Sequence, residues 1–226
     1  MTRAWIGALA VLATTGCVPL VAPADHLDTL PASAAAEQSE THLDAGCCFW
    51  PALNASRTLV PEGNEHLMVD LGGQIAPTNG SFGAGLWVRS PPGEKAGFGG
   101  RIGAYGGVGD AMGFVPWEMP YGGGTLHAQL AGTSWDERRR WAATIGGGYA
   151  VPLGPDEYWV EDITVEHEDG TTSEGGTGVP VPNGWAEVEG RIELGESGSQ
   201  AFTAGLGVRM SMWGAVVPRA SIGLRL

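Results

Sequence analysis

Residues 202–212, FTAGLGVRMSM, and residues 220–226, ASIGLRL, decide the fold of this chain because apolar and polar residues alternate in both. From Phe202 to Met212, apolar side chains occupy every second position, and polar residues or glycines occupy the positions between them. Successive side chains of an extended strand point to opposite faces. Each stretch therefore predicts a strand with one apolar face and one polar face.

The same two-residue period marks six earlier segments, which are residues 65–75, 82–89, 98–108, 126–130, 141–151 and 185–194. Most are longer than the five or six residues typical of soluble sandwich strands, and the set averages close to the length of a tilted membrane-crossing strand. No apolar stretch beyond the N-terminal region is long enough for a membrane helix. The pattern predicts an all-β fold, an antiparallel up-and-down β-barrel of about eight strands over residues 65–226.

Composition narrows the classes of function. The chain has 226 residues, of which 12 are Lys or Arg and 25 are Asp or Glu, for a net charge of −13. Nucleic-acid binding needs concentrated basic surface, so we expect no nucleic-acid partner. The hydrophobic content of 43% is too high for a disordered chain. The 38 glycines fit curved β-structure better than helices.

The N-terminal region predicts an export signal followed by a tether. Residues 1–16 have the layout of a signal peptide, with Arg3, an apolar run and then small residues. The small residues before Cys17 resemble the bacterial lipobox, which implies that Cys17 is lipidated and becomes the mature N-terminus. The absence of Asp after Cys17 resembles outer-membrane sorting. Residues 17–64 are expected to form a lipid-anchored flexible tether and a transitional segment.

Two connections in the predicted barrel are long, 109–123 and 152–183, and they are the third and fifth in order. Odd-numbered connections of an up-and-down barrel lie at one end, as the long outward loops of outer-membrane barrels do. Within the second, 156–174 carries eight acidic residues and no Lys or Arg. Residues 157–167 are expected to form one arm of a hairpin above the membrane. A surface partner would meet these two loops.

The polar faces carry the candidate interior residues. If the apolar faces touch lipid, the barrel interior holds charged and polar side chains whose opposite charges neutralise one another: Asp70, Arg89, Arg101, His127, Glu187, Glu189, Arg191, Glu193, Arg209 and Arg225. Trp87 and Trp185 would fill the remaining space. The alternative is a soluble barrel or sandwich in the periplasm, with its apolar faces inward around an apolar ligand and its arginines in water.

Chemical motifs are sparse. His127 with a serine and Glu187 would suit a lipid-modifying hydrolase, but no Gly-x-Ser-x-Gly stretch is present. Catalysis is therefore the least favoured hypothesis, and we expect no cofactor. The spacing of Cys47 and Cys48 supports no zinc site, and their redox state stays open. The acidic insertion lacks EF-hand spacing, so a solvated loop is favoured over a Ca²⁺ site.

The alternating pattern over residues 65–226 resembles that of bacterial outer-membrane β-barrel proteins, and the last strand resembles their C-terminal assembly signal. That signal usually ends in Phe or Trp, whereas this chain ends in Leu226. The resemblance implies a bacterial outer-membrane location with lipid as a partner. We therefore expect a small non-enzymatic outer-membrane lipoprotein with a structural or surface-interaction role.

Overall fold

The structure is a computed structural model that describes residues 38–47, 51–77, 79–91, 96–109, 120–133, 139–153, 162–166, 172–176, 183–195, 200–212, 214 and 216–226. No helix in this part of the chain is long and apolar enough to cross a membrane.

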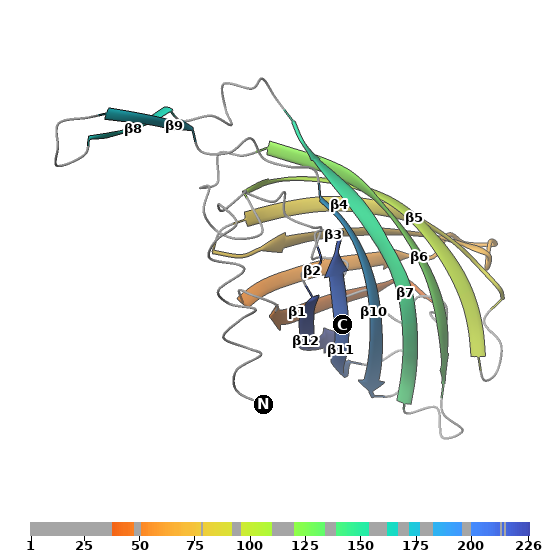
Figure 1. The fold of residues 1–226 in the computed structure, drawn as a ribbon. Coiled ribbons are helices and arrows are strands. Elements are labelled where there is room, and N and C mark those ends of the chain that lie inside the picture. Colours follow the sequence, from red (N-terminus) through yellow and green to blue (C-terminus); the bar gives the residue numbers. More distant parts are fainter. Residues whose placement is uncertain are drawn as a thin grey trace.

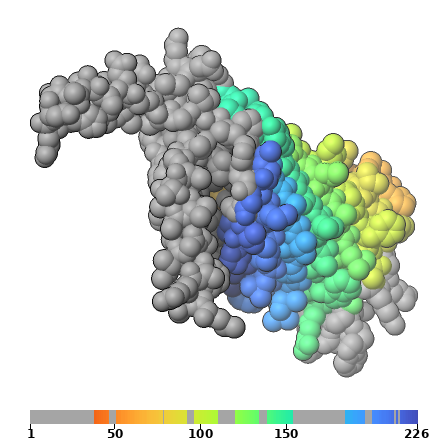
Figure 2. Space-filling view, viewed as in Figure 1, coloured from red at the N-terminus to blue at the C-terminus, as the bar shows by residue number. Residues whose placement is uncertain are grey.

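Ten of the described strands close into one antiparallel barrel in the ring order β1-β12-β11-β10-β7-β6-β5-β4-β3-β2 (Figure 1). Their bounds are β1 (Glu40–Cys47), β2 (Pro51–Leu59), β3 (Leu67–Ile75), β4 (Asn79–Arg89), β5 (Ala96–Gly109), β6 (Pro120–Thr133), β7 (Arg139–Pro152), β10 (Asn183–Leu194), β11 (Ala201–Ser211) and β12 (Val216–Arg225). Figure 2 shows β11, β10, β7 and β6 following one another across one face. The predicted antiparallel β-barrel is confirmed.

The expected number of about eight strands is wrong, because β1 and β2 also belong to the barrel. The sequence interpretation assigned residues 17–64 to a tether, yet β1 pairs with both β2 and β12 and closes the ring. The outward face of β1 presents Leu43 as its one large apolar residue, between Thr41 and Ala45. Its inward face is charged. The alternation of apolar and polar residues is therefore weak in β1, which is why the sequence pattern did not identify this strand. The barrel begins at Glu40 rather than at Glu65.

Within residues 157–167, which were expected to be one arm of a hairpin, residues 162–166 form β8 (Asp162–Glu166), whose partner is β9 (Thr172–Gly176). Residues 157–161 and 167 lie outside the described residues. These two strands make a separate two-stranded sheet, drawn apart from the barrel in Figure 1. The longest connection of the barrel therefore carries its own β-hairpin.

The two ends of the barrel differ in their connections. Consecutive barrel strands are antiparallel neighbours, so connections alternate between the ends. The connections β5–β6 and β7–β10 fall at the same end, hereafter the loop end. At the other end, hereafter the terminus end, β1 begins and β12 finishes, and His42 is paired with Arg225. Adding two strands before residue 65 leaves this parity unchanged, so the prediction that both long connections share an end is confirmed.

Burial alternates along the barrel strands with the sequence pattern. In β4, for example, inward residues are buried at every second position and the residues between them are half-buried or exposed. The apolar faces are the exposed ones and the polar faces are the buried ones. The packed centre of this fold is therefore polar, and its outer surface is apolar.

Candidate functional site

The outer wall is the first candidate functional surface. Large apolar side chains on it are widely exposed, with exposed fractions of 72% for Leu206, 68% for Leu126 and 64% for Ile102. Apolar surface left in water costs roughly 25 cal/mol per Å², and soluble monomers rarely expose apolar patches beyond a few hundred Å². A wall that is apolar around the ring suits hydrocarbon rather than water as its neighbour.

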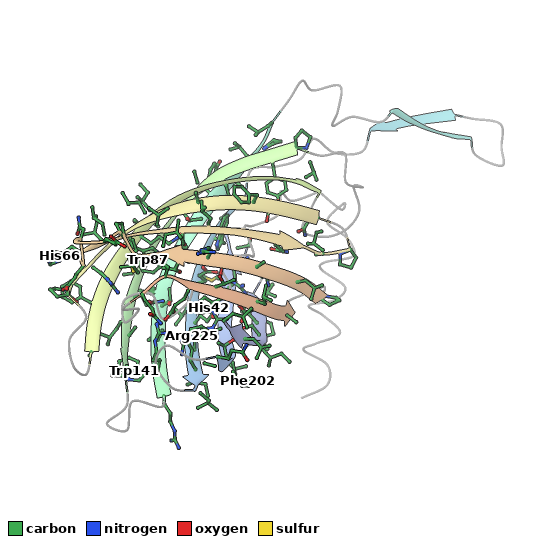
Figure 3. The ribbon with its side chains drawn as sticks, turned by 180° about the vertical axis from the view of Figure 1, so that it is seen from behind. His42, His66, Trp87, Trp141, Phe202 and Arg225 are labelled. Atoms are coloured by element: carbon green, nitrogen blue, oxygen red, sulfur yellow. The ribbon has the colours of Figure 1, made fainter. Side chains whose placement is uncertain are left out.

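Aromatic side chains lie near both edges of this wall. Phe82 and Tyr149 are outward residues close to the loop end, whereas Phe98, Trp141 and Phe202 are close to the terminus end. Figure 3 shows Trp141 and Phe202 near the same end of the barrel. Aromatic girdles at the two interfaces are typical of membrane-spanning barrels. Trp135 and Trp213, which the sequence also places near strand ends, lie outside the described residues.

The interior is the second candidate. Ten residues were expected there, and nine of them are buried: Asp70, Arg89, Arg101, His127, Glu187, Arg191, Glu193, Arg209 and Arg225. The tenth, Glu189, is half-buried. Trp87 and Trp185 are also buried. The soluble alternative required the reverse arrangement, with apolar side chains inside and arginines in water.

Glu187 on β10 is the centre of an ionic cluster that lies towards the loop end of the interior. Its Oε2 accepts hydrogen bonds from Nη2 of Arg209 at 2.6 Å and from Nη1 of Arg219 at 2.7 Å. Its Oε1 lies 2.8 Å from Nε2 of His127. The Arg209 guanidinium also lies 5.3 Å from the ring centroid of Trp185. One carboxylate thus connects four strands, β6, β10, β11 and β12.

A second ion pair crosses the opposite side of the interior. Arg101 on β5 donates from Nε to Oδ2 of Asp70 on β3 at 2.7 Å, and from Nη1 to Oγ1 of Thr125 at 2.8 Å. The pair passes over β4 at Gly85, where a Cβ atom would overlap both Asp70 and Arg101. Glycine at this position makes room for the pair.

A third cluster closes the interior at the terminus end. Glu40 on β1 accepts a hydrogen bond from Arg140 on β7 at 2.7 Å, although three strands separate β1 from β7 in the ring. Glu193 lies 3.3 Å from Arg140 and 3.2 Å from Arg225. Figure 3 shows His42 and Arg225 close together in the barrel.

Asp44 supplies a further tie across the interior. Its Oδ1 accepts hydrogen bonds from Nη2 of Arg191 on β10 at 2.6 Å and from Oγ1 of Thr203 on β11 at 2.9 Å. A ten-stranded barrel is wider than the eight-stranded one whose interior side chains just fill it. Long arginine and glutamate side chains span that additional width.

Sequence reasoning missed five ionisable members of these clusters, Glu40, His42, Asp44, Arg140 and Arg219. The first three lie on β1, which the interpretation left in the tether. Arg140 and Arg219 lie just before the segments in which the alternation was recognised. Their positions share the strand parity of Ala142 and Ser221, so extending each strand by one pair of residues identifies both.

The remaining interior residues take up simpler roles. Arg89 donates from Nε to the backbone carbonyl of Glu65 at 2.8 Å, which fixes the β2–β3 connection at the terminus end. Trp87 is fully buried, and Trp185 packs edge-on against Tyr105 with ring centroids 6.0 Å apart. These aromatic rings fill space between the ionic clusters.

The structure brings together His127 and Glu187, two members of the hypothetical hydrolase site. However, Nδ1 of His127 has no hydrogen-bond partner among the described residues, and the side chain is fully buried. A lipid outside the wall does not reach this ring. No group of three or more His, Cys, Asp or Glu in the described part of the chain is arranged to hold a metal ion.

Several predicted features lie outside the described residues. They are Cys17, Cys48 and most of the two long connections. Cys47 is in β1.

No protein-family model matches the chain, and no curated protein matches its sequence. Among solved structures, the chain is similar to the N-terminal β-barrel domain of Pseudomonas aeruginosa OprF, with 10% identity, a TM-score of 0.36 and coverage of 84% of this chain and 98% of that chain. It is also similar to the KdgM porin, with 8% identity, a TM-score of 0.38 and coverage of 83% and 97%. The translocator domain of autotransporter NalP from Neisseria meningitidis has 9% identity, a TM-score of 0.36 and coverage of 83% and 86%.

Proposed function

We propose that this chain is a small, non-enzymatic β-barrel protein that spans the bacterial outer membrane. The observation that carries the proposal is the combination of an exposed apolar outer wall and a buried, charge-paired interior. Each of the ten described barrel strands is hydrogen-bonded to a neighbour on each side, so none of them presents an open edge to hydrocarbon. Lipid is accordingly the main partner of the outer wall.

We further propose an orientation with the loop end outside the cell and the terminus end in the periplasm. Membrane barrels have long outward loops and short periplasmic turns. Both long connections share the loop end, whereas β1 begins at the opposite end. A lipid on Cys17 would then anchor the segment before β1 in the periplasmic leaflet. The acidic loop over residues 152–183 would face outward.

A structural or surface-interaction role fits this arrangement. Cross-barrel ties such as Arg140 to Glu40 and Arg191 to Asp44 obstruct the interior, which argues against an open pore. Contact with a partner would then fall to the connections over residues 109–123 and 152–183. The soluble ligand-binding alternative and the hydrolase alternative lack a comparable supporting observation.

Membrane fractionation combined with heat-modifiable gel mobility tests the proposal. We expect the protein in the outer-membrane fraction, with a faster-migrating band in unheated samples that shifts on boiling. A known periplasmic protein is the control for fractionation. Recovery of the chain as a monomer in detergent-free periplasmic extract, with no heat-dependent shift, would contradict the proposal.

Lipidation at Cys17 needs its own test. Metabolic labelling with a fatty-acid analogue is expected to mark the wild-type protein and to leave the Cys17→Ser variant unlabelled. The heat-modifiable shift should survive in that variant, because the described barrel strands begin only at Glu40, after Cys17 in the chain. Equal labelling of both proteins would sink the assignment of the lipid to Cys17.

A further inference from the structure

The outer wall carries a groove with a cation beside it. The groove has a volume of about 870 Å³ and is lined by residues of β1, β2, β3, β4, β11 and β12. Its outward-facing lining is apolar, so an aliphatic chain is the chemistry that fits it.

Strand register explains the shape of the groove. Ala55 on β2 is paired with Gly73 on β3, so two of the smallest side chains lie side by side and form a low part of the wall. Larger residues stand around them, with Leu43 beside Ala55 and Phe202 beside Leu224. The depression follows from small outward residues on the two neighbouring strands β2 and β3.

Arg57 occupies the next outward position on β2 after Ala55, towards the terminus end. Two residues of a strand span roughly 7 Å. Arg57 is exposed and makes no ion pair within the described residues. In the part of the barrel strands that the structure describes, Arg57 and Arg139 are the only exposed charged residues, and both lie at the terminus end. A guanidinium at this level matches the depth of a lipid phosphate.

We propose that the groove and Arg57 form a binding site for one glycerophospholipid of the periplasmic leaflet. An acyl chain lies over Ala55 and Gly73, and the phosphate accepts hydrogen bonds from the Arg57 guanidinium. The inference rests on the proposed membrane-spanning function and adds to it a defined lipid. Arg139, which is exposed at the same end and does not border this groove, is the natural control.

The test uses the full-length protein in nonionic detergent, titrated with phosphatidylglycerol, with bound lipid counted by native mass spectrometry. We expect Arg57→Gln to weaken binding by roughly fivefold, the factor that one exposed ion pair supplies. Ala55→Leu fills the groove and should weaken binding by a similar factor of roughly five. Arg139→Gln should stay within about twofold of the wild-type protein.

Ligand controls identify the recognised chemistry. Diacylglycerol with the same acyl chains lacks the phosphate and should bind about as weakly to the wild-type protein as phosphatidylglycerol binds to Arg57→Gln. Inorganic phosphate should not compete, because it lacks an acyl chain. Equal effects of Arg57→Gln and Arg139→Gln, or unchanged binding by Ala55→Leu, would overturn the site.

Vesicle insertion, assayed by heat-modifiable mobility on the same preparations, distinguishes a failure of the lipid site from a failure of the proposed function. A wild-type barrel that inserts while Arg57→Gln binds lipid normally overturns the lipid site and leaves the proposed function standing. A wild-type barrel that does not insert overturns both.

Discussion

The outer and inner faces of the same strands obey different rules. On the outer wall, Leu206 and Leu126 have no specific partner, and any apolar side chain of similar size would serve. In the interior, Glu187 serves three cationic or polar partners at distances of 2.6–2.8 Å. The outer face therefore requires only apolar side chains that suit the surrounding medium, whereas the inner face requires particular residues at particular positions. Substitutions should therefore have costs that depend on the face.

The largest effect is expected for Glu187→Gln. This change keeps the shape of the side chain but leaves Arg209 and Arg219 buried without their shared negative charge. Breaking a buried ion pair by removing one partner costs about 3–5 kcal/mol. Guanidinium unfolding of the protein refolded in vesicles should show that loss. A variant within about 0.5 kcal/mol of wild type, the range usual for surface substitutions, would contradict the interior network.

The next effect is expected for Leu206→Arg, in the middle of β11 on the outer wall. A charge at the bilayer midplane of a membrane barrel costs about 2–4 kcal/mol. Leu206→Ile is the control, since it keeps the surface apolar and should cost less than about 1.5 kcal/mol. The same unfolding assay checks both variants. If Leu206→Arg were as stable as Leu206→Ile, the outer wall would be in water.

Two glycines on β5, one on each face, test whether the inner and outer faces of a single strand differ in their tolerance of an added methyl group. A Cβ atom at inward Gly103 would overlap the Arg101 guanidinium and lie 2.8 Å from Oγ1 of Thr125, whereas one at outward Gly100 would come no closer than 3.8 Å to its nearest neighbour. Gly103→Ala should therefore cost about 1–3 kcal/mol through overpacking. Gly100→Ala should be within about 0.5 kcal/mol of wild type. Unfolding midpoints that fall equally in the two variants would remove the distinction.

The smallest effect is expected at the edge of the outer wall. The substitution Arg57→Leu removes a charge near the terminus end, where the cost of a charge on the lipid face falls to about 0–1 kcal/mol. The free energy of unfolding should accordingly change by no more than about 1 kcal/mol, in contrast to Leu206→Arg. A change as large as that of Leu206→Arg would place Arg57 deep in the membrane and refute the assigned depth.

The sequence predicts the barrel class, the strand alternation and nine buried interior residues, because the two faces of those strands differ from each other in polarity. β1 escaped recognition because its signal lies on the inward face, in Glu40, His42 and Asp44, while its outward face is weakly apolar. Charge balance offered a clue. The arginines predicted to be interior outnumbered the predicted interior acids, and β1 supplies the missing partners Glu40 and Asp44.

The pairing within the clusters was beyond sequence reasoning for a different reason. Arg140 reaches Glu40 across three intervening strands, and such a contact depends on the number of strands in the ring. An eight-stranded ring would have placed different residues opposite one another. Similarly, the contact of His127 with Glu187 passes over Gly146, whose missing Cβ leaves space for the imidazole ring.

The most direct measurement asks which medium touches the outer wall at Leu206. A nitroxide label is attached to the Leu206→Cys variant and, as a reference for water, to the Glu62→Cys variant in the exposed β2–β3 connection, with the three native cysteines replaced by serine. Collision rates with oxygen, which concentrates in lipid, and with a water-soluble nickel complex are then compared in vesicles. The account predicts that oxygen dominates at position 206 and nickel at position 62. A label at position 206 that collides with nickel as often as the one at position 62 would contradict the account.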